Sequence, residues 1–252
     1  MDIRLSGKTV LITGGASGAG QAIVKEFAKT GANVAFTFHH TLPDELLNEL
    51  GDTGITAYCF DQSDLSQIDE LVSMVMKDYG HIDVLVNNAG IYPARAFEKI
   101  SEADWDEMMG VNTKGVFFLS RAVARCMEEG SIINISSINA YNPASSLIHY
   151  GVSKAGVEME TRCLAYELGP KIRVNCIAPG LICKKGQEGF IPGWVESYSE
   201  RAALKRIVRP EEIGDTAIFL ASDYASAITG QIITVDCGVS LAPYFDNHLE
   251  DL

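Results

Sequence analysis

The sequence predicts an α/β fold in which a parallel sheet is covered by helices on both faces, a doubly wound arrangement. Short runs of aliphatic and aromatic residues alternate with longer segments of helical apolar spacing along the chain. A glycine-rich segment, Thr13–Gly20, follows the first short run, where a strand would lead into a helix. Strands separated by helices are typical of right-handed crossovers between parallel strands.

The expected strands are short and rich in Val, Ile and Phe, as buried parallel strands are. In chain order they are Lys8–Thr13, Asn33–Phe38, Ile55–Phe60, Val84–Val86, Ile132–Ser136, Ile172–Ile177 and Ile232–Val235. The intervening segments repeat apolar residues at helical spacing. They predict helices at about Gly18–Lys29, Leu65–Lys77, Ala103–Met127, His149–Leu168 and Pro210–Leu220. The interval Leu181–Arg201 is rich in glycine and predicts an irregular lid.

Length and composition indicate one globular domain. The 252 residues contain no repeat, low-complexity tract or linker, so we expect residues 1–252 to form a single domain. Hydrophobic residues make up 47% and charged residues 21%, from which a large core can form. No apolar run approaches the length of about 20 residues that a membrane-spanning helix needs. Met1–Ser6 is short and polar, which predicts no signal peptide and a cytoplasmic protein.

Charge and cysteine usage exclude several functions. The formal net charge of −13 opposes binding to nucleic acid or to an anionic membrane, because such partners require a basic surface. The six cysteines form no CxxC and no metal-ligand spacing, so we expect no metal site. They are interpreted as reduced core residues, with Cys183 close to the expected site. Their positions are Cys59, Cys126, Cys163, Cys176, Cys183 and Cys237.

Tyr150 and Lys154 carry the chemistry that the sequence indicates most directly. They stand four residues apart in Tyr-Gly-Val-Ser-Lys, which places both side chains on one face of a helix. An ammonium roughly 5 Å from a phenol, at an effective dielectric of about 20, favours phenolate by about 3 kcal/mol, or about two pKa units. We therefore expect Lys154 to lower the pKa of Tyr150 toward the range where proton transfer to a substrate oxygen is efficient.

The glycines of Thr13–Gly20 suit a phosphate-binding turn. Gly14, Gly18 and Gly20 are spaced more widely than in GxGxxG, yet they allow a tight turn and close approach of a pyrophosphate. The charge of such a group is favoured at the N-terminus of the following helix. A glycine-rich turn with a purely structural role is the alternative.

Further motifs complete a pattern that resembles one superfamily. They are Asn87-Asn88-Ala89-Gly90, Asn112, Ser137 at thirteen residues before Tyr150, and Pro179-Gly180. With Thr13–Gly20, Tyr150 and Lys154 they occur in the order of the short-chain dehydrogenase/reductase superfamily, in its compact one-domain form. The resemblance runs from about Ser6 to Gly238. It implies a Rossmann-like sheet of seven strands that binds NAD or NADP, and commonly a homotetramer, with a homodimer as the other option.

The resemblance implies catalytic roles for four residues. Tyr150 would exchange a proton with the substrate oxygen, and Lys154 would lower the Tyr150 pKa and bind the nicotinamide ribose. Ser137 would hydrogen-bond the same oxygen, which stabilises charge that develops there. Asn112 would kink its helix and hold a water linking Lys154 to solvent. The implied reaction is hydride transfer between nicotinamide and a secondary alcohol or ketone. Taken singly, each residue also has a structural interpretation.

The implied cofactor contacts lie at the ends of several strands. They are Gly14, Ser17, Gly18, Ala19, Gly20, Phe38, His39, Asp61, Gln62, Asn88, Ala89, Gly90, Tyr150, Lys154, Pro179, Gly180 and Ile182. NADP(H) is favoured over NAD(H), because the second strand ends at Phe38 without the carboxylate that would hold ribose hydroxyls. His39 and His40 follow and could donate to a 2′-phosphate, although they could equally be solvated turn residues. Asp61 could alternatively serve only as a helix N-terminal carboxylate.

The substrate is left open by the sequence. The implied pocket contains Tyr92, Pro93, Asn139–Ser146 and the lid near Leu181–Tyr198, which suits a small ketone, a sugar or polyol, or a steroid-like alcohol. A β-ketoacyl carrier-protein reductase is ranked below these, because Met127-Glu128-Glu129-Gly130 is acidic where a carrier-protein docking surface should be basic.

Two further expectations concern the whole chain. A dinucleotide-binding regulator without turnover is the alternative from another functional class. The tail over residues 239–252 is longer than the last strand requires, so it is expected either to cover the site of a neighbouring subunit or to fray.

Overall fold

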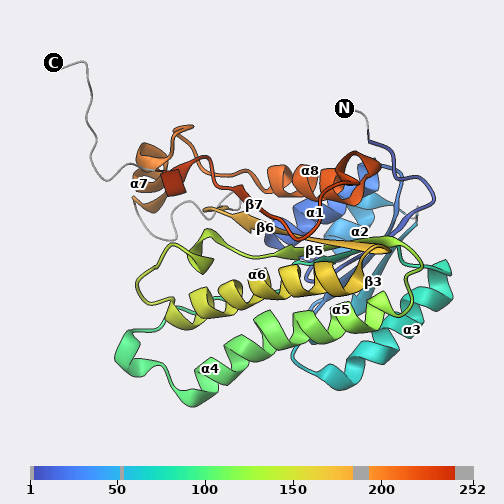
Figure 1. Ribbon diagram of the computed structural model, residues 1–252, viewed down its shortest axis with the longest axis horizontal. Helices are drawn as coiled ribbons and strands as arrows, with labels where there is room; N and C mark the ends of the chain where they lie inside the picture. The colour runs from blue at the N-terminus through green and yellow to red at the C-terminus, as the bar shows by residue number, and fades with distance from the viewer. Residues whose placement is uncertain (1–2, 52–53, 184–192, 242–252) are drawn as a thin grey trace.

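Seven parallel strands form one sheet in the order β3-β2-β1-β4-β5-β6-β7 (Figure 1). The computed structural model describes residues 3–51, 54–183 and 193–241. The strands are β1 (Thr9–Ile12), β2 (Asn33–Phe38), β3 (Ile55–Cys59), β4 (Val84–Asn87), β5 (Gly130–Ile135), β6 (Ile172–Pro179) and β7 (Ile232–Val235). The order reverses direction between β1 and β4, and ligands of open α/β sheets bind outside the carboxyl ends of strands at such a switch point.

Helices cover both faces of this sheet. The helices are α1 (Gly18–Lys29), α2 (Asp44–Leu50), α3 (Ile68–Tyr79), α4 (Glu102–Met109), α5 (Val116–Ala124), α6 (Ile148–Leu168), α7 (Trp194–Arg201) and α8 (Pro210–Ala221). Figure 1 shows α3, α4, α5 and α6 on one side of the sheet and α1 and α8 on the other. The expected doubly wound, seven-stranded fold is confirmed.

The alternation of side chains along each strand divides the core in two. Val10 and Ile12 of β1 pack in the cluster that contains α1 and α8, whereas Leu11 packs in the cluster that contains α3, α5 and α6. Because successive side chains of a strand point to opposite faces, a strand buried on both faces is apolar throughout. This is why the expected strands read as continuous apolar runs.

Three elements of the structure differ from the expectation. The seven-residue helix α2 buries only Leu46, too little apolar periodicity to be recognised in the sequence. Helix α7 lies inside the expected irregular lid, and none of its residues is buried. The expected helix Ala103–Met127 contains a π-helical segment, Gly110–Gly115, between α4 and α5. Residues 184–192 of the expected lid and 242–252 of the expected tail lie outside the described residues.

The cysteines are only partly core residues. Cys176 and Cys237 are buried as expected, but Cys59 and Cys163 are exposed. Cys59 is the last residue of the edge strand β3, and Cys163 lies on the outer side of α6. In the described part of the chain, no helix is long and apolar enough to cross a bilayer. The same residues contain no group of three or more His, Cys, Asp and Glu side chains able to hold a metal ion.

Candidate active site

The turn between β1 and α1 is tight, and its glycines stand where a side chain would strain the backbone or collide with it. Gly14 and Gly18 have positive φ angles of 65° and 62°, which glycine adopts without strain. A Cβ atom on Gly20 would lie 2.1 Å from the Gly14 carbonyl oxygen. The end of β2 holds the turn in place, since Gly14 N–H donates to Thr37 Oγ1 at 3.0 Å and Gly15 N–H to the Thr37 carbonyl at 2.9 Å.

The N-terminus of α1 fits an anionic group. Ser17 occupies the N-cap position, but its side chain makes no capping hydrogen bond, and the first turn of α1 carries no acidic residue. Backbone N–H groups at a helix N-terminus and the helix dipole favour an anion there. The residues present therefore fit the pyrophosphate of a dinucleotide, with Gly18, Ala19 and Gly20 in the first turn.

Polar side chains join the ends of β1 and β4 at the switch point. Asn88 Nδ2 donates to the carbonyl oxygens of Thr13 (2.9 Å) and Gly14 (3.2 Å). Thr13 Oγ1 accepts from the N–H groups of Asn88 and Ala89 at 3.1 and 3.0 Å. Asn88 thus shapes the glycine turn through its side chain. Thr13 is fully buried, and its side chain makes as many hydrogen bonds at this junction as that of Asn88 does. The sequence pattern had drawn attention to the glycines of this turn rather than to Thr13.

Asn112 lies at the centre of the π-helical segment and is fully buried. Its carboxamide exchanges two hydrogen bonds with the backbone of Ile91 and donates to Ser153 Oγ at 3.1 Å. Single-turn π segments inside α-helices are frequent at functional sites. The expected irregularity of this helix at Asn112 is present, and it ties the loop after β4 to α6.

Lys154 projects from α6 into the same region. Its Nζ donates to the Ile135 carbonyl at the end of β5 at 2.8 Å, and the side chain is buried. A Cβ on Gly90 would lie 3.4 Å from Lys154 Nζ and 3.2 Å from Asn112 Oδ1, so both groups converge on Gly90. Burial lowers the pKa of Lys154 to about 8, because desolvation disfavours the charged form.

The environment of Tyr150 differs from the electrostatic expectation. Lys154 Nζ lies 5.8 Å from the centre of the Tyr150 ring, close to the distance assumed from helix geometry. Burial nevertheless raises the pKa of Tyr150, a hydrogen bond with Ser137 lowers it, and the nearby Tyr92 raises it again, with a net increase. The expected lowering of the Tyr150 pKa is therefore wrong for the protein chain alone. Desolvation of the buried phenol is the largest cause of the increase.

Ser137 and Tyr92 complete the surroundings of Tyr150. Ser137 Oγ accepts from the Asn139 N–H at 3.1 Å, which leaves its hydroxyl hydrogen for Tyr150. The rings of Tyr92 and Tyr150 meet edge to face at 6.2 Å, and Tyr92 is 72% exposed. An exposed aromatic ring next to a buried phenol indicates the mouth of the site.

The expected cofactor residues beyond β2 and β3 also lie close together. His39 Nε2 is 3.4 Å from Asp61 Oδ2. Gln62 is buried, and its Nε2 donates to the carbonyl oxygens of Ala89 and Val111, whereas its Oε1 has no partner among the described residues. Gln62 therefore braces the loop that contains Ala89 and Gly90. Phe38 is the last residue of β2 and is half-buried.

Pro179 is the last residue of β6, and Gly180 and Ile182 follow it at the other side of the switch point. Gly180 N–H donates to the Val235 carbonyl at 2.9 Å, and a Cβ on Gly180 would collide with the Tyr198 hydroxyl. Ile182 forms an isolated bridge with Val208 and packs against the core. The Ile182 side chain therefore anchors the segment after β6 to the hydrophobic core. Tyr198 ends the range expected for the lid over the pocket, and its position depends on α7.

Comparisons with known proteins agree with this geometry. The chain matches the model of a family described as enoyl-(acyl carrier protein) reductase over residues 14–240. The 3-oxoacyl-(acyl-carrier-protein) reductase FabG of Thermotoga maritima is 41% identical over 244 residues, which cover 94% of this chain and 99% of that protein. The D-xylose 1-dehydrogenase of Caulobacter vibrioides is 37% identical, covering 93% and 96% of the two chains. A solved short-chain dehydrogenase/reductase from Brucella melitensis, described as glucose/ribitol dehydrogenase, has a TM-score of 0.91 at 33% identity and covers 95% and 99%.

The chain belongs to the short-chain dehydrogenase/reductase superfamily. It is an oxidoreductase that uses a nicotinamide dinucleotide and acts on CH–OH or C=O groups. The relatives are named as dehydrogenases and reductases, which argues against the alternative of a regulator without turnover.

Proposed function

We propose that this chain interconverts a secondary alcohol and a ketone with Tyr150 as the general acid and base. In reduction, the Tyr150 hydroxyl gives its proton to the substrate oxygen, and Ser137 donates a hydrogen bond to the same atom. The dinucleotide, when bound, supplies the hydride to the carbon that carries this oxygen. In oxidation Tyr150 takes that proton back, and Ser137 keeps its hydrogen bond to the same oxygen.

Lys154 and Asn112 assist this proton transfer without contacting the substrate. A Lys154 pKa of about 8 leaves the ammonium largely charged at pH 7, where it stabilises developing phenolate on Tyr150. Asn112 and Lys154 converge on Gly90, where a water held by both would connect them to solvent. The observation that carries the proposal is that Ser137, Tyr150 and Lys154 meet from β5 and α6 beside the loop after β4.

The substrate is a cyclic hydroxy compound or its ketone, of the size of a sugar or a carbocyclic alcohol. Tyr92 stands edge-on to Tyr150 with most of its ring exposed. Tyr141 is 46% exposed, and its hydroxyl is 3.1 Å from Thr234 Oγ1. Exposed aromatic rings with polar tips offer a stacking face and hydrogen bonds to a ring-shaped polar molecule. Following absorbance at 340 nm with aldoses, polyols and cyclic ketones tests this, and activity confined to linear thioesters would overturn it.

A β-ketoacyl carrier-protein thioester is the second candidate substrate, favoured by the 41% identity to a FabG protein. The exposed Glu128 and Glu129 oppose docking of an acidic carrier. Comparing a β-ketoacyl carrier-protein thioester with the same acyl group on a short thiol separates the two candidates. Docking predicts a much lower KM for the carrier-linked form, whereas equal values would exclude carrier recognition.

NADP(H) is the preferred dinucleotide. The residues that end β2 include no carboxylate that would hold the ribose hydroxyls, and His39 and His40 follow there, with Asp61 beyond the end of β3 beside His39. The KM for NADPH should be at least about tenfold below that for NADH, the difference expected of a charge-assisted contact. Equal or reversed values would remove the assignment.

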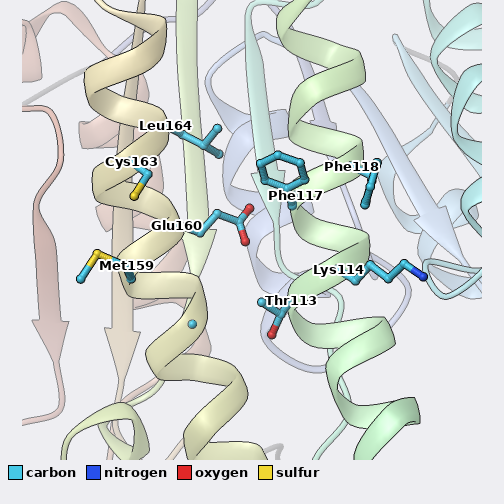
Figure 2. Close-up of a pocket in the computed structure, with 9 residues that line it drawn as sticks. Thr113, Lys114, Phe117, Phe118, Met159, Glu160, Cys163 and Leu164 are labelled. Atoms are coloured by element: carbon cyan, nitrogen blue, oxygen red, sulfur yellow. The ribbon is translucent and has the colours of Figure 1, made fainter.

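Self-assembly through α5 and α6 is part of the proposal, giving a homotetramer or a homodimer. Ile148, Val152, Met159 and Tyr166 form an exposed apolar stripe along one face of α6. A groove of about 500 Å³ lies between α5 and α6. It is lined by Thr113, Lys114, Phe117, Phe118, Gly156, Met159, Glu160, Cys163 and Leu164 (Figure 2).

A second copy of the chain is the occupant that this face fits. Phe117 and Met159 border the groove with exposed apolar surface, which a twofold contact would cover on both copies. Light scattering after gel filtration should show a dimer or tetramer that Met159→Glu shifts toward monomer. Phe97→Glu, at an exposed residue before α4, should leave the assembly intact. A monomeric wild type would refute this part.

We further propose that residues 1–252 work as one domain in the cytoplasm. The exposed thiols of Cys59 and Cys163 suit a reducing compartment. Visualising the tagged protein in its cells tests the location.

A further inference from the structure

Glu158 lies on α6 one helical turn after Lys154. Its Oε1 accepts a hydrogen bond from Ser136 Oγ at 3.1 Å, directly after the end of β5. Residues four apart share one face of a helix, so Glu158 continues the row that Tyr150 and Lys154 begin. All three side chains of this row therefore reach the same end of β5.

Ser136 stands between the two residues that the proposed catalytic side chains contact. Ile135 precedes it, and the Ile135 carbonyl accepts from Lys154 Nζ at 2.8 Å. Ser137 follows it and hydrogen-bonds with Tyr150. Because the three residues are consecutive in the chain, a displacement of Ser136 would move the partners of both catalytic side chains at once.

The surroundings of Ser136 tie it to β6 and to α6. Its N–H donates to the Ile177 carbonyl at 2.8 Å, and its side chain is buried. Its Oγ lies 3.2 Å from the Lys154 carbonyl oxygen and 3.1 Å from Glu158 Oε1. The Lys154 carbonyl also accepts from the backbone N–H four residues later in the helix. Glu158 is therefore the side chain through which α6 grips Ser136.

Few charged groups surround the half-buried Glu158. Burial raises the pKa of Glu158, whereas the Ser136 hydrogen bond and the charge of Arg162 lower it, with a net increase. On β6, the thiol of Cys176 is influenced by both Glu158 and Lys154, and burial raises its pKa to about 12, so it is neutral. The contact with Ser136 survives either protonation state, because a carboxylate accepts from the hydroxyl and a neutral carboxyl can donate to it.

We propose that Glu158 is a positioning residue: through Ser136 it holds the end of β5 against α6 and so fixes the partners of the catalytic side chains. This rests on the proposed function, because it concerns the geometry of that reaction. Two other accounts compete with it. In one, Glu158 acts through its charge on the reacting groups, and in the other its contact with Ser136 only stabilises the fold.

Steady-state kinetics of the dinucleotide-bound enzyme compare Glu158→Ala with Glu158→Gln. The glutamine keeps an oxygen that accepts from Ser136 and removes the charge, so its kcat should stay within about twofold of wild type. The alanine should lower kcat about tenfold and leave KM within about twofold, since an orienting hydrogen bond is lost while substrate binding is kept. Ser136→Ala should lower kcat by a similar factor. The double variant Ser136→Ala/Glu158→Ala should lose no more than either single variant.

The pH profile of alcohol oxidation separates positioning from the effect of charge. An ammonium that is held less firmly stabilises phenolate on Tyr150 less, because the attraction falls with distance. The pH at which kcat reaches half its maximum should therefore rise in Glu158→Ala and keep its wild-type value in Glu158→Gln. If the charge of Glu158 acts instead, both variants should shift equally and to lower pH, because loss of a nearby anion favours phenolate.

Hydrogen exchange followed by mass spectrometry gives a readout that needs no turnover. The N–H groups of Ser136 and Asn139 are bonded to the Ile177 carbonyl and to Ser137 Oγ. If Glu158 holds this segment, residues 135–140 should exchange at least about fivefold faster in Glu158→Ala than in wild type. The segment should exchange at the wild-type rate in Glu158→Gln.

Two matched controls exclude general effects of the substitutions. Glu167→Ala removes an exposed carboxylate further along α6. Ser73→Ala removes an exposed serine hydroxyl that donates to the Asp69 carbonyl on α3. Both should keep the wild-type kcat and pH profile, and thermal unfolding should show every variant folded.

A wild-type kcat and pH profile in Glu158→Ala would overturn the proposal, even if thermal unfolding were affected, because the role would then be structural. Equal impairment of Glu158→Gln and Glu158→Ala would assign the effect to charge and overturn it as well, as would additive losses in the double variant. A wild type without turnover of any alcohol or carbonyl, but with the expected exchange difference, would count against the proposed reaction alone.

Discussion

Asn112 holds the backbone of Ile91 at two points: its Oδ1 accepts from the Ile91 N–H at 2.8 Å, and its Nδ2 donates to the Ile91 carbonyl at 2.9 Å. Ile91 directly follows the Asn88–Gly90 motif at the end of β4. The π-helical segment thereby fixes the loop against which Lys154 packs. A single buried amide joins the proposed dinucleotide end of the site to the proposed reacting end.

Asn112→Ala should therefore impair both stability and turnover. Two partly buried backbone groups of Ile91 would lose their partners, which should lower the free energy of unfolding by about 2–4 kcal/mol. Displacement of the loop should reduce kcat by about a hundredfold. Urea unfolding and steady-state kinetics measure the two effects. Asn48→Ala, at an exposed residue of α2, is the control, and a fully active Asn112→Ala would contradict the role assigned to this contact.

Tyr150→Phe should remove the proton donor while the ring stays in place. We expect kcat to fall by about 10²–10⁴ in the absence of a general acid. The Kd of the dinucleotide, measured by fluorescence or calorimetry, should change little. Tyr224→Phe, at an exposed tyrosine after α8, should behave as wild type. Substantial residual turnover would assign the proton transfer to another group.

Lys154→Met should abolish turnover and stabilise the fold at neutral pH. The folded-state pKa of about 8 lies below the ordinary value of 10.5, so burying the charged form opposes folding below pH 8 by about 3 kcal/mol. This penalty declines as pH rises from 8 to 10.5, because the unfolded chain then also loses the proton. Urea unfolding should show the stabilisation at pH 7 and much less of it at pH 10. A pH-independent difference would show that packing, not charge, is responsible.

Glu160→Gln should stabilise the protein only at alkaline pH. Burial raises the Glu160 pKa from 4.5 to about 8, and its Oε1 has no partner in the described structure. Figure 2 shows the carboxylate extending from α6 toward Phe117 of α5. Ionisation therefore opposes folding increasingly from pH 4.5 to 8 and fully above pH 8.

Thermal unfolding at pH 5 and pH 9 separates the effect of the Glu160 charge on stability from the effect of its side-chain shape. Glu160→Gln should raise Tm at pH 9 and leave it nearly unchanged at pH 5. Glu167→Gln, at an exposed position on α6, should have no effect at either pH. An equal gain at both values would contradict the titration of Glu160.

Local sequence signals account for much of the fold. The bounds expected for α1, β2 and β7 coincide with the structure, because each combines a clear apolar pattern with a clear boundary. The spacing of Tyr150 and Lys154 placed both on α6 for the same reason. Helices α2 and α7 were missed, since short helices that bury one residue or none leave little periodic signal.

Backbone propensity and short-range spacing sufficed to predict the seven strands, most of the longer helices, the glycine turn and the position of Tyr150 and Lys154 on one helical face. Only the tertiary structure decided that burial raises the Tyr150 pKa and that His39 meets Asp61. Desolvation depends on everything packed around a group, and strand register joins residues far apart in the chain. Neither can be read from spacing along one segment.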